Sequence, residues 1–194
     1  GKSDFAVSLE ALREEMPACG SVSLVVSWFG DDLRCGECRV KPKVEQTAYD
    51  GTPMAWRSGG VTRSEAEMGP RDADDRPVYG GTPADAAVVE AIQAMKAEGL
   101  DVVFYPFLLM EQMAGNGLPD PWTGAGDQPE LPWRGRITQS IAAGRDGSPD
   151  GTAAADAEVE AFFGQAVAGD FNVNGTQVNY SGPEEWSFRR FILH

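Results

Sequence analysis

The chain has 194 residues, 42% hydrophobic and 24% charged, which suits one ordinary globular core. Its 30 acidic and 16 basic residues give a formal net charge of -14, and phosphate backbones and acidic leaflets repel so anionic a surface. We therefore expect no nucleic acid partner and no membrane insertion, because the longest apolar runs are about ten residues, half of a bilayer span.

The first predicted helix covers residues 4–16, where apolar side chains recur at helical spacing until Pro17. A nearly continuous apolar run then follows at residues 21–30 and stops before Asp31 and Asp32. Such a run is typical of a parallel strand that is buried on both faces. The N-terminus has no hydrophobic core or cleavage site of a signal peptide.

Residues 31–81 form a long loop rich in charge, Gly and Pro, with β-like pieces at 39–45 and 54–62 that predict a hairpin. Thr82 then supplies an N-cap, followed by Pro83, for a helix that ends at Gly99. A second apolar run at residues 101–110 predicts another buried strand, which ends at Glu111.

The rest of the chain continues the alternation. Residues 112–133 are dense in Gly, Pro and Trp and predict a second long loop. We expect a third strand at 134–141, a helix at 152–167 and a hairpin at 171–180 around the turn dipeptide Asn174-Gly175. A last helix is expected from Pro183, and the chain stops inside it without a C-cap.

Helices that alternate with strands imply a parallel sheet with right-handed crossovers. Three predicted strands are too few for a closed barrel of eight, so the sheet is expected to be open or unfinished. We predict a single α/β domain over residues 1–194, with long loop insertions at 31–81 and 112–133.

Four carboxylates lie just beyond predicted strand ends, where ligands gather in α/β sheets. They are Asp31, Asp32, Glu111 and Asp120. Glycoside hydrolysis uses two carboxylates that flank the scissile bond, so all four are candidates for substrate binding. The alternative for each is a solvated loop acid or a helix cap.

Three tryptophans are further candidates, because aromatic faces stack on the apolar faces of sugar rings. They are Trp28, Trp122 and Trp133. The alternative is a role in the core or in anchoring the loops. Arg134, beside Trp133, is a candidate for an anionic group or for an ion pair with the loop acids.

The sequence gives little support to metal binding, to catalysis by a histidine-containing triad or to nucleotide binding. Cys35 and Cys38 form a CGEC motif, but two further zinc ligands at workable spacing are missing. We expect two thiols or one local disulfide there, and no metal. A single histidine, His194, gives little support to a Ser-His-Asp triad, and no phosphate-binding or dinucleotide motif is present. No cofactor is expected.

Five long segments carry a family resemblance: SVSLVVSWFGDDLRCGEC, RPVYGGTPADAAVVEAI, VVFYPFLLMEQMAGNGLPDPWTG, LPWRGRIT and YSGPEEWSFRRFILH. Together they resemble the TIM-barrel-like domain of the large tail protein of gene transfer agents and tailed phages, the glycoside hydrolase/phage tail family. The resemblance implies the N-terminal part of a (β/α) TIM-like barrel. It also implies a baseplate or tail-hub module of a phage-tail-like particle that contacts cell-envelope glycans.

The partners implied are other tail and baseplate proteins, and cell-surface polysaccharide or peptidoglycan. The implied location is the tail of a phage-like particle that is made in the bacterial cytoplasm. An incomplete barrel exposes a strand edge, so self-association is also expected. The alternative function is a fragment of an active glycoside hydrolase. Its catalytic Glu residues would lie beyond His194, so no catalytic residue is assigned within the chain and these 194 residues alone are expected to be inactive.

Overall fold

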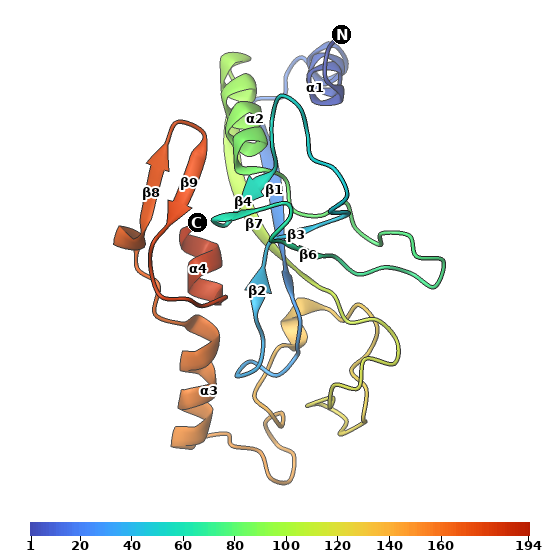
Figure 1. Ribbon diagram of the computed structural model, residues 1–194, viewed down its shortest axis with the longest axis vertical. Helices are drawn as coiled ribbons and strands as arrows, with labels where there is room; N and C mark the ends of the chain where they lie inside the picture. Colours follow the sequence, from blue (N-terminus) through green and yellow to red (C-terminus); the bar gives the residue numbers. More distant parts are fainter.

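Figure 1 shows the computed structural model of the protein, which describes all residues from 1 to 194. Two strands of ten residues, β1 (Ser21–Gly30) and β7 (Asp101–Met110), run parallel along their whole lengths. The short strand β2 (Val40–Lys41) pairs antiparallel with the end of β1, so the strand order is β2-β1-β7. Both long strands are confirmed within the predicted bounds, and β7 is an edge strand.

Four helices accompany the sheet: α1 (Asp4–Glu15), α2 (Asp85–Ala97), α3 (Ala153–Phe163) and α4 (Phe188–Leu193). All four were predicted, but three have different ends. The N-cap of α2 is Ala84, because the Thr82 hydroxyl instead accepts the Lys43 N–H and donates to the Ser27 carbonyl.

The helix α3 ends before residue 167, at Gly164, whose φ of 71° is a conformation that favours glycine. The helix α4 begins only after Ser187, whose hydroxyl accepts the Arg190 N–H as an N-cap. None of the four helices has the length and apolar character that crossing a bilayer requires.

The remaining strands are short and form two-stranded pairs. In the loop 31–81, β3 (Lys43–Val44) pairs with β6 (Glu67–Met68), and β4 (Arg57–Ser58) forms a hairpin with β5 (Val61–Thr62). The loop therefore holds a hairpin, but it lies within the piece 54–62, and the two predicted pieces do not pair with each other. Near the end of the chain, a second hairpin joins two strands of four residues across Asn174-Gly175. These strands are β8 (Phe171–Asn174) and β9 (Gln177–Tyr180), which confirm the hairpin predicted there.

The predicted barrel architecture is wrong. The sheets have two or three strands, and one crossover through α2 links the parallel strands β1 and β7 without a further repeat. The predicted third strand at 134–141 is instead a 3-10 turn, η1 (Arg134–Arg136), followed by irregular chain with one bridge between Thr138 and Arg34. The fold is a mixed α/β structure with small sheets and no closure.

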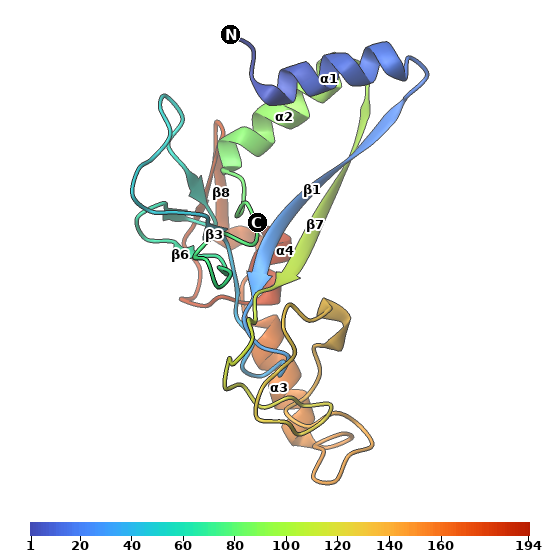
Figure 2. The same cartoon turned by 90° about the vertical axis from the view of Figure 1, so that its right-hand side faces the viewer.

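The core lies against the carboxyl-terminal halves of β1 and β7. Trp28 is 2% exposed and packs on Phe191 with ring centroids 5.4 Å apart. Val25, in the other half of β1, is 50% exposed, so the strand is not buried on both faces along its length as predicted. In Figure 2 the two strands extend away from the loops and α3 toward α1, which buries no residue of its own.

Candidate functional site

The two faces of the β1-β7 sheet have different surroundings. Val26 and Trp28 line a small cavity together with residues of α2 and α4, so that face is covered by helices. Alternate residues point to the opposite face, which we call the open face. There Phe29 packs on Tyr79 at 5.7 Å, and the Arg134 guanidinium lies 4.0 Å over the ring of Phe107.

A cavity of about 300 Å³ lies on the open face beside β7, and we call it the Trp133 hollow. Its lining residues are Tyr79, Phe107, Leu108, Leu109, Met110, Leu131, Pro132, Trp133 and Arg134. The loop 112–133 forms one wall, because the Leu131 N–H donates to the Gln112 carbonyl at 2.7 Å and thereby brings Trp133 back beside the end of β7. Trp133 is 64% exposed.

A charged cluster lies where β1 and β7 end. Asp31 and Glu111 directly follow Gly30 and Met110, the last paired residues of the two strands. Strand alternation therefore puts both carboxylates on the open face. The buried ammonium of Lys43 lies 2.7 Å from each carboxylate oxygen of Glu111.

The Lys43 ammonium also lies 3.1 Å from the Glu67 carboxylate, which pairs with Lys41 as well. One oxygen of Glu111, Oε2, is buried and makes no hydrogen bond, so its contact with Lys43 is ionic only. We call these residues, with Asp31, the Lys43 cluster.

Burial raises the pKa of both strand-end carboxyls. For Asp31 the raising effect of burial exceeds the lowering effect of the Arg39 N–H and of nearby cations. For Glu111 burial again dominates over the attraction of Lys43, and the negative charges of Asp31 and Glu67 raise the pKa further. Carboxyls with raised pKa values at a strand end are typical of functional sites, since a proton is held there more readily than in water.

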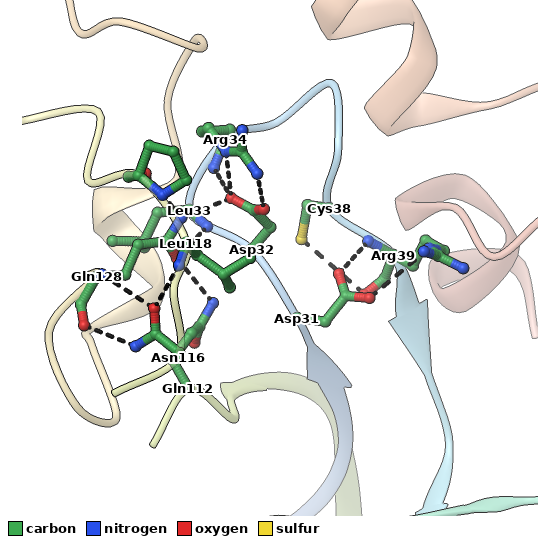
Figure 3. Close-up of polar contacts among 11 residues, drawn as sticks. Asp31, Asp32, Leu33, Arg34, Cys38, Arg39, Gln112, Asn116, Leu118 and Gln128 are labelled. Carbon is green, nitrogen blue, oxygen red and sulfur yellow. Dashed lines mark hydrogen bonds and ion pairs between the residues drawn. The ribbon is translucent and has the colours of Figure 1, made fainter. Parts of the chain in front are cut away.

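Asp32 stabilises the loop after β1 through its contacts with Arg34 and Gln128. Figure 3 shows Asp32 directed toward Arg34 and Gln128, while Asp31 is directed toward Arg39. Asp32 is buried, and it accepts the Arg34 backbone N–H at 2.8 Å, two guanidinium bonds and the Gln128 amide at 2.7 Å. With its acceptor sites occupied, Asp32 holds the loop after β1 in place.

The buried Gln128 is a residue that sequence reasoning missed. Its side-chain oxygen accepts the Leu33 N–H at 2.9 Å, and its amide donates to Asp32 and to the Pro119 carbonyl. It thus joins the loop after β1 to the loop after β7. A glutamine within a polar loop is an ordinary residue in the sequence, so no local signal could have found it.

Asp120 and Trp122 stabilise the loop 112–133 itself. The buried Asp120 carboxylate accepts the Trp122 N–H and the Thr123 hydroxyl, which is a local turn interaction. The indole N–H of Trp122 donates to the Arg136 carbonyl at 2.6 Å. Trp28 lies in the core, where its ring is not accessible from solvent.

The structure therefore separates the eight candidate residues into two groups. Asp31 and Glu111 lie together in the Lys43 cluster, while Trp133 and Arg134 line the adjoining hollow. The other candidates serve the core or the loops: Trp28, Asp32, Asp120 and Trp122. No group of three or more His, Cys, Asp or Glu side chains is placed to hold a metal ion.

Comparison with protein families and curated proteins identifies no relative of this chain. No protein-family model matches the chain, and no curated protein matches it. The function is therefore inferred from the chemistry of the Trp133 hollow, the Lys43 cluster and the resemblance described from the sequence.

Proposed function

We propose that this chain is a carbohydrate-binding module of a phage-tail-like particle, and that its glycan lies in the Trp133 hollow. The observation that carries the proposal is the placement of Trp133. Trp133 is 64% exposed at the rim of a cavity whose other lining residues, apart from Arg134, are apolar or aromatic. An exposed indole beside such a cavity suits stacking on the apolar face of a sugar ring.

The size and lining of the hollow support a small sugar segment as the ligand. Its volume of about 300 Å³ is at the lower end of the range for ligand pockets, roughly 300–1,000 Å³. Tyr79 and Phe107 add two further aromatic rings to the lining, and Leu109 adds an aliphatic side chain. Rings and aliphatic carbons can exclude water from one face of a sugar while its hydroxyls stay at the rim.

The Lys43 cluster lies close to the hollow, because Glu111 directly follows Met110, which lines it. Carboxylates accept hydrogen bonds from sugar hydroxyls, and an ammonium donates to them. Both oxygens of Glu111 lie 2.7 Å from Lys43, so this carboxylate is neutralised by an ion pair. We therefore propose binding rather than hydrolysis as the activity of these residues.

A glycan titration tests the binding proposal. Tryptophan fluorescence and calorimetry are followed while peptidoglycan and polysaccharide fragments are added to the native chain and to two variants. We expect Trp133→Ala to weaken binding about tenfold or more, which corresponds to about 1.4 kcal/mol. Tyr49→Ala, which removes another strongly exposed aromatic side chain at a position that does not line the hollow, is the matched control.

Two results would contradict the binding proposal. The first is the absence of any response across a broad glycan panel. The second is equal affinity of the native chain and Trp133→Ala.

The assignment to a particle tail rests on the five long segments that resemble the large tail protein. It proposes other tail and baseplate proteins as partners and the particle tail as the location. Antibody labelling of purified particles in the electron microscope should mark the tail tip. Recovery of the protein only from the particle-free fraction of a producing culture would refute this assignment.

A further inference from the structure

The side chain of Arg134 lies against two aromatic rings. Its guanidinium carbon lies 4.0 Å from the ring centroid of Phe107 and 4.1 Å from that of Trp133. Cation–π contacts of this kind hold a guanidinium in one place and orientation. Aromatic rings contact the flat face of a guanidinium, whereas its N–H donors lie in the plane of the group and remain available to a ligand.

Most of those donors are free of protein partners. The one side-chain hydrogen bond of Arg134 goes to the Tyr105 hydroxyl at 3.4 Å, and no carboxylate pairs with it. Some arginines of this acidic chain are paired with carboxylates, as Arg34 is with Asp32 and Arg63 is with Glu45, and their donors are occupied. Arg134 therefore keeps its charge without a carboxylate partner and has N–H donors left for a ligand.

Arg134 also lies where two cavities meet. It lines the Trp133 hollow, and it lines a neighbouring open groove of about 670 Å³ between β7, α3 and α4. In the hollow it is the only charged lining residue. A ligand stacked on Trp133 would thus meet the edge of the guanidinium at short range.

We infer that the glycan bound in the Trp133 hollow carries a carboxylate, which the guanidinium of Arg134 recognises edge-on. This inference rests on the proposed function and adds the chemical class of its ligand. A planar carboxylate matches the fork of N–H donors with two parallel hydrogen bonds. The partly covered guanidinium is weakly hydrated, so the ligand displaces little water from it.

A matched pair of sugars tests the inference. GlcNAc–MurNAc carries a lactyl carboxylate, and chitobiose has the same kind of disaccharide backbone without it. We expect the native chain to bind GlcNAc–MurNAc at least about tenfold more tightly, since charge-assisted hydrogen bonds contribute on the order of 1.5–3 kcal/mol. Arg134→Gln should reduce this preference to about twofold or less, and Arg134→Lys should restore only part of it because the fork is lost.

Arg189→Gln is the control, because it removes the same charge from an exposed position on α4 outside the hollow. It should keep the preference of the native chain. Thermal unfolding of each variant shows whether it is folded. The comparison of the two disaccharides on the native chain needs no substitution, so it tests the inference even if a variant fails to fold.

The possible results separate the two proposals. Equal affinity of the native chain for both disaccharides would overturn the carboxylate inference while glycan binding stands. Tighter binding of N-acetylglucosamine 6-phosphate than of GlcNAc–MurNAc would overturn the choice of carboxylate. Binding of no sugar at all would overturn the proposed function and this inference together.

Discussion

Neighbouring acidic residues have different roles in this protein because their partners differ. Asp32 is saturated by Arg34 and Gln128, whereas Asp31 keeps a partly exposed carboxylate with a raised pKa. Glu111 is the corresponding residue after β7, and the buried Lys43 neutralises it. At the scale of single residues, the charge balance of the strand ends therefore depends on Lys43.

Replacing Lys43 by methionine should destabilise the protein by about 3 kcal/mol at about pH 7, since it leaves the Glu111 charge buried and unpaired. The pKa of Glu111 is already raised, and loss of the Lys43 attraction raises it further. An acid with a raised folded-state pKa favours the folded state when protonated. The stability lost through Lys43→Met should therefore shrink as the pH falls toward 4.5, the ordinary pKa of Glu.

Urea unfolding of the native chain and Lys43→Met at about pH 7 and about pH 5 checks this expectation. The double variant Lys43→Met/Glu111→Gln, in which both charges are removed, should be more stable than Lys43→Met at the higher pH. A loss that is the same at both pH values would show that Glu111 does not carry the effect.

At the scale of elements, the junction between α3 and α4 depends on one carboxylate. Glu185 accepts the Gln165 N–H at 2.9 Å, the Ala166 N–H at 3.0 Å and the Ser187 hydroxyl at 2.7 Å. Burial alone would raise the pKa of Glu185, but these hydrogen bonds outweigh it and the pKa is lowered. Glu185 thus links the end of α3 to the N-cap of α4.

Substituting Glu185 by glutamine should cost roughly 1–2 kcal/mol at neutral pH, the usual net effect of losing charge-assisted hydrogen bonds. A lowered folded-state pKa gives stability that is present above the unfolded value of 4.5 and is lost as the pH falls through the folded pKa. The native chain and Glu185→Gln should therefore converge in acid. Thermal unfolding across this range measures the difference, with Glu184→Gln, an exposed neighbour, as control.

The elements also show why local patterns can mislead. The apolar spacing in residues 152–167 continues past Gly164, yet the helix ends there, where φ is 71° and where Glu185 and Ser187 approach so closely that only glycine fits. Likewise, residues 134–141 read as a strand, but the Arg134 side chain stacks on Phe107 of β7 and the backbone turns at η1. In both cases a contact between segments decided against the local pattern.

At the scale of the whole molecule, β7 is an edge strand, and one of its sides has no partner strand. The N–H groups of Asp101 and Glu111 donate to the β1 side, at Gly20 and Gly30. The backbone N–H groups of the odd-numbered residues of β7 therefore point toward β1. The nitrogen of Pro106 points away from β1, toward the free edge of the sheet, where a missing N–H donor is tolerated. Val103 and Tyr105 are exposed on the open face beside this edge.

We expect this edge to mediate weak self-association with a second copy of the chain. Two copies of charge -14 repel each other, and salt screens that repulsion. Sedimentation velocity should therefore show a dimer fraction that increases with protein concentration and with ionic strength. Val103→Lys should abolish the dimer fraction. Val159→Lys, the control on the exposed face of α3, should leave it unchanged. A monomer at all salt concentrations would exclude the edge as an interface.

The sequence by itself determined the elements whose signals are local. These include β1, β7 and the hairpin at 171–180, because apolar runs and turn residues act over a few neighbouring positions. It also located Asp31 and Glu111 directly after the ends of the two long strands. What it could not determine was that β1 and β7 remain the only long parallel pair, so that no barrel forms.

Only the tertiary structure decided which side chains share a site. Gln128 meets Asp32 across 96 positions of the chain, and Lys43 meets Glu111 across 68. These contacts depend on how loops fold over the strand ends, and residue periodicity carries no information about such distant pairs. For that reason Asp32 and Trp28 look like site residues in the sequence but serve the loop and the core, while Lys43 and Tyr79 join the site.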